Sequence, residues 1–246
     1  MIEADVWLMA GIVAFYLYDA AILLYADELV AWPRRRGWSA SVGGQLQWRG
    51  RFVFVPPPLL PWRPLLRLQW LRAAGDSVPV QQSALDDLRR ALKPLQIAVA
   101  LMAVLLVALL PLALLLWRRW EVMLLLLGAI YLLSACMVLY SVRVRVALGL
   151  SRAALVSLAI DTLACPPFAL NVVRKISLRH ATGMDGLQFA TATLAPAELQ
   201  RLHVHLLPRV EALLQGEPAD SSRAGQLRAC QQFLLSQEPE RCDESA

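Results

Sequence analysis

The sequence has little charge and few cysteines, and both shortages exclude classes of protein. Asp, Glu, Lys and Arg make up 17% of the 246 residues, whereas 58% are hydrophobic. Soluble domains carry about 25% charged residues. The composition therefore excludes a disordered chain and an ordinary soluble enzyme. Four cysteines without a C-x-x-C pair do not form a disulfide framework or a zinc site. With a mean hydropathy of +0.50, an integral membrane protein remains.

The motifs of common catalytic and cofactor sites are also missing. The chain has no P-loop and no dinucleotide-binding glycine fingerprint. Residues 149–153 miss the G-x-S-x-G pattern because Ala153 replaces its last glycine. His203 and His205 are two positions apart on a predicted helix, so they point to nearly opposite sides. We therefore predict a protein that is not an enzyme, with no catalytic residue, metal ligand or cofactor.

Long apolar runs are what the sequence does have. Residues 95–117 and 122–142 contain no charged residue, and each is long enough for a membrane-spanning helix of about 20 residues. Only residues 118–121 separate them, which predicts an antiparallel helical hairpin. Residues 6–25 form a third candidate span. They lack a basic flank and a cleavage site, so we expect an uncleaved anchor.

Residues 153–173 are apolar but are expected to break. Asp161 lies in their middle and Pro166-Pro167 follows, so we predict a re-entrant or interfacial segment, with a fourth span as the alternative. Residues 1–25 contain no base, whereas residues 26–93 contain eleven bases and five acids. Because bases favour the cytoplasm, we expect the N-terminus outside and the C-terminus inside a bacterial inner membrane crossed several times.

The predicted fold is an all-α integral membrane protein with three transmembrane helices and a re-entrant or interfacial segment. A small β-hairpin at residues 45–55, a surface helix at 65–72, an amphipathic helix at 83–92 and a C-terminal helical hairpin would complete it. The expected divisions are an anchor at 1–25, a cytoplasmic segment at 26–93, a membrane hairpin at 94–142, the broken segment at 143–173 and a cytoplasmic tail at 174–246.

The cytoplasmic segment is rich in tryptophan and arginine, a combination enriched at binding hot spots. It holds five of the eight tryptophans. The predicted binding residues are Trp48, Arg49, Arg51, Trp62, Arg63, Arg67 and Trp70. A membrane-hugging linker without a ligand is the plainest interpretation. A protein-docking surface, a site for anionic lipid headgroups or phosphate, and, least favoured, a nucleic-acid surface are the alternatives. We expect lipid and protein partners and no nucleic acid.

Two acids lie within apolar segments, where an ionisable group indicates function by default. Asp19 could simply remain hydrated near the interface or accept a hydrogen bond from a tyrosine, and Tyr16 lies one turn before it. Asp161 could hold the broken helix in place. The functional alternative is a proton- or ion-responsive pair, which requires the two carboxyls to approach each other or a cation.

Three functions follow from these patterns. The leading hypothesis is a non-enzymatic accessory or assembly subunit that docks partner proteins at the cytoplasmic face of the membrane. The first alternative is a small oligomeric transport or ion-coupled component that uses Asp19 and Asp161. The second is a membrane enzyme that acts on a phosphorylated lipid, with arginines of the cytoplasmic segment as the phosphate ligands.

Overall fold

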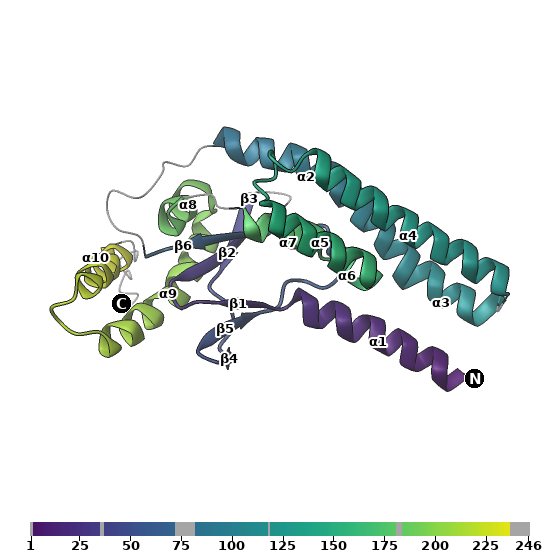
Figure 1. Ribbon diagram of the computed structural model, residues 1–246. Helices are drawn as coiled ribbons and strands as arrows, with labels where there is room; N and C mark the ends of the chain where they lie inside the picture. Colours follow the sequence, from purple (N-terminus) through teal and green to yellow (C-terminus); the bar gives the residue numbers. More distant parts are fainter. Residues whose placement is uncertain (1, 35–36, 72–81, 118, 181–183, 237–246) are drawn as a thin grey trace, which may run out of the picture. The chain divides into compact units, whose positions relative to one another are not determined.

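The computed structural model describes residues 2–34, 37–71, 82–117, 119–180 and 184–236. The chain forms two compact units, and each is assembled from segments far apart in the sequence. Unit 1 comprises residues 1–22, 55–67 and 81–181, and unit 2 comprises residues 23–54, 68–80 and 182–246. Figure 1 shows the elements of both units along the chain.

The prediction of an all-α protein with three membrane helices is wrong. The described residues contain two three-stranded sheets besides the helices, and two helices, not three, are long and apolar enough to cross a membrane. Residues 65–72, predicted as a surface helix, instead form strand β6 (Leu66–Gln69). Strand β6 was missed because it is short and its partner in the sheet lies more than 30 residues earlier in the chain, so tertiary pairing overrides the local pattern.

The first long apolar segment of unit 1 is a helix that includes the predicted amphipathic stretch. It consists of α2 (Gln82–Ala103), the π-helical segment η1 (Val104–Leu109), α3 (Leu110–Leu112) and a second π-helical segment η2 (Ala113–Trp117). Buried leucines of α2 recur at helical spacing. They are Leu85, Leu88, Leu92 and Leu95. Pro94 lies inside α2 without ending it.

The second apolar helix, α4 (Trp120–Arg143), packs against α2. Figure 1 shows the two running side by side as a hairpin, as predicted. The hydroxyl of Tyr140 donates to the carbonyl of Ala91 at 3.0 Å and fixes their register. Their apolar windows are only 22% buried. Within the part of the chain that the structure describes, the two helices therefore present a large exposed apolar surface.

The predicted first span is shorter than expected. Helix α1 covers Ile2–Ala20, and its apolar part from Met9 to Ala20 falls below the length of a spanning helix. The chain then continues into strand β1 (Ile22–Leu24). The apolar residues after Ala20 are therefore not part of the helix, because their backbone groups pair within a sheet.

The segment at 153–173 is broken as predicted. Helix α5 (Arg152–Ala164) ends at Cys165, where Pro166 and Pro167 start the short helix α6 (Pro166–Ala169). Helix α7 (Val172–Arg179) follows. A proline lacks the N–H that would continue α5, and its ring disfavours helical backbone at the residue before it. Whether this segment crosses a membrane stays a prediction.

Both sheets lie mainly in unit 2, with the first residue of β1 and the first two residues of β6 assigned to unit 1. One has the order β3-β2-β6, and the other β1-β5-β4. Strand β2 (Glu28–Arg34) pairs antiparallel with β3 (Gly37–Ser41), from Val30 opposite Ser41 to Arg34 opposite Gly37. The start of β2 is buried on both faces. Helix α8 (Gly186–Thr193) packs on β3, where Phe189 meets Trp38 edge to face at 5.0 Å.

The predicted β-hairpin is confirmed. Strand β4 (Gln47–Trp48) pairs antiparallel with β5 (Arg51–Phe54) through a two-residue turn. The turn residues Arg49 and Gly50 have φ angles of 51° and 75°, which is the pattern of a type I′ turn. Glycine adopts this backbone freely, but arginine does so at a cost of about 1 kcal/mol.

The predicted C-terminal helical hairpin is also confirmed. Helix α9 (Pro196–Gly216) packs against α10 (Ser222–Ser236). The Ser221 hydroxyl caps α10 by accepting from the N–H of Ala224 at 3.0 Å. The core-facing residues are Leu202, Leu206, Val210, Leu227, Cys230 and Leu234. Phe233 of α10 is 38% exposed.

Candidate functional site

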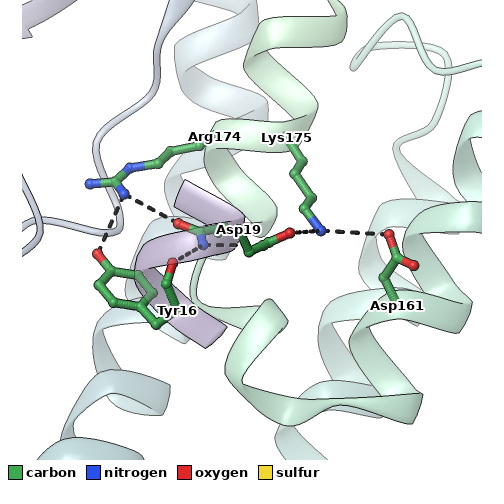
Figure 2. A network of polar contacts seen from close by, with 6 residues as sticks. Tyr16, Asp19, Asp161, Arg174 and Lys175 are labelled. Carbon is green, nitrogen blue, oxygen red and sulfur yellow. Dashed lines mark hydrogen bonds and ion pairs between the residues drawn. The ribbon is translucent and has the colours of Figure 1, made fainter. Parts of the chain in front are cut away.

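The two carboxylates predicted inside apolar segments meet at one lysine in unit 1. The Lys175 ammonium lies 2.9 Å from Asp19 Oδ1 and 3.5 Å from Asp161 Oδ2. Figure 2 shows the lysine extended between the two acids. Asp19 is in the last turn of α1, Asp161 is near the end of α5, and Lys175 is on α7. The ammonium therefore joins three helices.

The pair of Asp19 and Lys175 is the more shielded of the two. Their side chains are 15% and 18% exposed, whereas that of Asp161 is 38% exposed. Lys175 also lies over the Phe168 ring, with Nζ 4.9 Å from the centroid. Phe168 in turn meets Phe15 of α1 edge to face at 6.1 Å. The aromatic contacts exclude water from one side of the ammonium, which strengthens its attraction to Asp19.

Asn171 extends this cluster at the start of α7. An asparagine before a helix commonly caps it by accepting a backbone hydrogen bond, but here the side chain makes no such bond. Its amide nitrogen instead donates to Asp19 Oδ2 at 3.1 Å and to the carbonyl of Tyr16 at 3.3 Å. The amide oxygen accepts from Arg174 at 3.2 Å. The break after α6 thus supplies the polar residue that holds the end of α1.

Arg174, beside Lys175, points toward the proline-rich segment at residues 56–64 rather than toward the two acids. Its Nη2 donates to the carbonyls of Pro57 at 2.7 Å and Leu60 at 3.0 Å. Its Nη1 reaches the Tyr16 hydroxyl at 3.4 Å, and Figure 2 shows both groups on the side away from Lys175. Burial lowers the pKa of Arg174 from its ordinary value. Arginine remains charged at neutral pH even so.

The two bases and two acids of this cluster balance in charge. Lys175 and Arg174 offset Asp19 and Asp161, so the group can lie among apolar helices without a net charge. The arrangement can therefore hold α1, α5, α7 and the proline-rich segment together.

The sequence identified part of this cluster. It singled out Asp19, Asp161 and the nearby Tyr16, and the functional hypothesis required the two acids to approach each other or a cation. The cation was missed because Arg174 and Lys175 directly follow the apolar residues 153–173, where bases are typical flanking charges of a membrane segment. Asn171 gave no signal beyond its position at a break. The Tyr16 hydroxyl does not bond Asp19 but donates to the Pro58 carbonyl.

The predicted tryptophan and arginine residues are divided between the units. Trp62, Arg63 and Arg67 belong to unit 1, and Trp48, Arg49, Arg51 and Trp70 belong to unit 2. Trp70 is 2% exposed and lies in the core, whereas Trp48 is 58% exposed. Arg51 donates to the Tyr25 hydroxyl and its guanidinium lies 4.3 Å from the centre of that ring. A binding role for these residues stays a prediction.

Three further groups in unit 2 have perturbed acidity because they are partly buried. Burial lowers the pKa of Arg209 to about 10, and its guanidinium carbon lies 3.4 Å from the centre of the Phe52 ring. Burial, then the charge of Asp185, raises the pKa of the Cys230 thiol to about 11, so this cysteine is unreactive at neutral pH. Burial also lowers the pKa of His203. No three His, Cys, Asp or Glu side chains gather into a metal-binding group in the part of the chain that the structure describes.

Comparisons with known proteins identify no family for this chain. No protein-family model matches the chain, and neither the curated proteins nor the solved structures include a significant match.

Proposed function

We propose that this protein is a non-enzymatic accessory or assembly subunit, anchored in a membrane by the hairpin of α2 and α4, that docks a partner protein through the β4–β5 hairpin. The proposal includes a bacterial inner membrane, an external N-terminus and a cytoplasmic C-terminus, from the distribution of bases. The outward apolar side chains of α2 and α4 support the anchor.

The exposed face of the β4–β5 hairpin carries the docking proposal. Leu46 is 69% exposed and Trp48 is 58% exposed. Leu46 directly precedes β4, and its carbonyl accepts from the N–H of Val53 at 2.9 Å, so the pairing with β5 extends to it. The two side chains, two positions apart in extended backbone, share a face. On the opposite face, Phe52 is covered by Arg209. One side of this hairpin is therefore packed, and the other presents two large apolar side chains to the surroundings.

The turn residue Arg49 adds a positive charge beside this face. Arg49 occupies a left-handed conformation that glycine or asparagine would adopt at less cost. Unfavourable backbone geometry that the fold retains at an exposed position supports a functional role for the side chain. The partner we propose is a protein with an apolar pocket for Trp48 and an acidic rim for Arg49.

Photo-crosslinking in intact membranes tests the docking surface. A photoreactive residue at position 46 should give one discrete heavier product, and Trp48→Ala should abolish it. The matched control is a photoreactive residue at Val204, which is 63% exposed on α9. Equal crosslinking from positions 46 and 204, or crosslinking at 46 that survives Trp48→Ala, would count against docking at this hairpin.

A second function is favoured by the contact of Lys175 with both acids. An oligomer of this chain could couple ion movement to protonation of Asp161 and Asp19. The test is flux into vesicles that contain the purified protein, measured as a function of external pH. Loss of pH-dependent flux in both Asp19→Asn and Asp161→Asn is expected. Wild-type vesicles without flux, or variants with unchanged flux, would remove this function.

A further inference from the structure

One end of the α2–α4 hairpin collects basic side chains from two separate parts of the sequence. Lys93 is an exposed residue of α2, Arg143 is the exposed last residue of α4, and Arg145 follows it. The bond from Tyr140 to Ala91 sets the level at which the helices meet. At 1.5 Å per residue, Lys93 and Arg143 therefore lie within about 8 Å of the same level along the helix axes, and Lys93 lies on the side of α2 away from the Tyr140 contact.

These three bases differ from their neighbours in their partners. Arg89 and Arg90 lie near acids of their own helix, 3.7 Å from Asp86 and 3.6 Å from Asp87. Lys93, Arg143 and Arg145 make no ion pair with any residue that the structure describes. Their positive charge is therefore available to a ligand that the chain does not provide.

The apolar surface begins immediately beside these bases. Ile97 lies one turn after Lys93 and is 65% exposed, and Leu139 lies one turn before Arg143 and is 68% exposed. An outward apolar band that ends in basic side chains matches the boundary between acyl chains and headgroups. Tyr140 lies at the same level, as interfacial tyrosines do.

We propose that Lys93, Arg143 and Arg145 form a basic zone at this end of the hairpin that binds the phosphates of anionic phospholipids. The inference rests on the membrane anchor of the proposed function and names a ligand for one end of it. A lipid is favoured over a protein because the basic group is continuous with the apolar band on both helices. The lipid acyl chains would cover that band while their phosphodiesters meet the bases at its end.

Native mass spectrometry in mild detergent tests the site directly. Purified protein is mixed with phosphatidylglycerol or with phosphatidylcholine, and the fraction of protein carrying lipid is measured. We expect a preference for phosphatidylglycerol on the order of tenfold or more. In the triple variant K93Q/R143Q/R145Q the two lipids should bind equally. The matched control R201Q/R223Q/R228Q loses the same charge from α9 and α10 and should retain the preference.

Each other outcome contradicts the site or the anchor. Equal binding of both lipids by the wild type, or an equal loss in the control variant, would overturn the lipid site. Competition by inorganic phosphate at the same concentration as the lipid would show a free-phosphate site instead. Alkaline washing of membranes tests the anchor separately. Wild type and triple variant should both stay in the pellet, and a wild type that washes off while preferring phosphatidylglycerol would contradict the anchor alone.

Discussion

The ammonium of Lys175 lies 2.9 Å from the carboxylate of Asp19, and this contact ties the last turn of α1 to α7. The same ammonium reaches Asp161 of α5 at 3.5 Å. The order of these three helices therefore depends on one charged group at their junction. A substitution at this junction should therefore change the free energy of unfolding more than it changes the exposed surface.

Removing the lysine should destabilise unit 1. We expect Lys175→Met to lower the free energy of unfolding by about 1–3 kcal/mol, because two partly buried carboxylates then lack their cation. A double-mutant cycle with Asp19→Asn should give a coupling of about 1 kcal/mol, measured by denaturation in detergent. The comparison pair is Arg223 and Glu217, 3.1 Å apart on a more exposed surface. Equal coupling in the two cycles would contradict the shielding of Lys175.

Removing the Arg174 guanidinium should free the proline-rich segment. Arg174→Met leaves the carbonyls of Pro57 and Leu60 without their shared donor, and we expect a loss of about 3 kcal/mol. Hydrogen exchange at residues 60–63 should accelerate. Arg179→Met is the control, because its bond to the Ala154 carbonyl is exposed. Unchanged exchange in Arg174→Met, or equal acceleration in both variants, would contradict this role, and Arg174→Lys covers the case in which the first variant does not fold.

Arg49 should show a trade-off between stability and docking. Asparagine tolerates the left-handed backbone better, so Arg49→Asn should raise the free energy of unfolding by about 0.5–1 kcal/mol. It should also weaken crosslinking from position 46, because the partner loses its basic contact. Thermal denaturation and crosslinking yield are the measurements. A variant that is no more stable than the wild type would contradict the backbone cost at position 49. A variant that crosslinks as well as the wild type would contradict the basic contact with the partner.

Protonation of His203 should destabilise α9. Burial lowers its pKa, so the unfolded state takes up a proton near pH 6.5 while the folded state does so only at lower pH. The free energy of unfolding should therefore decrease as pH falls below about 6.5. His203→Gln should remove part of that decrease, whereas the same change at exposed His205 should not. Urea denaturation at pH 7.5 and 5.5 is the measurement. If the free energy of unfolding changes by the same amount between these pH values in wild type and His203→Gln, the prediction is contradicted.

The sequence predicted what short-range patterns encode. Charge-free runs gave the hairpin of α2 and α4, the Pro166-Pro167 pair gave the break after α5, and the spacing of leucines gave α9 and α10. Apart from the β4–β5 hairpin, the sheets were not predicted. Strand β2 lies beside β6 across a long stretch of chain, and Leu66–Gln69 alone fits a helix equally well. The cation between Asp19 and Asp161 was missed for the same reason: no local pattern shows which charge a folded chain brings to an acid.

Purification from native membranes tests the docking of a partner protein most directly. The protein is isolated in mild detergent, and the mass and stoichiometry of the particle are measured for wild type, Trp48→Ala and the control Val204→Ala. We predict a second polypeptide in constant ratio in the wild type and the control, and its loss in Trp48→Ala. A bare monomer or a homo-oligomer in all three preparations would contradict it.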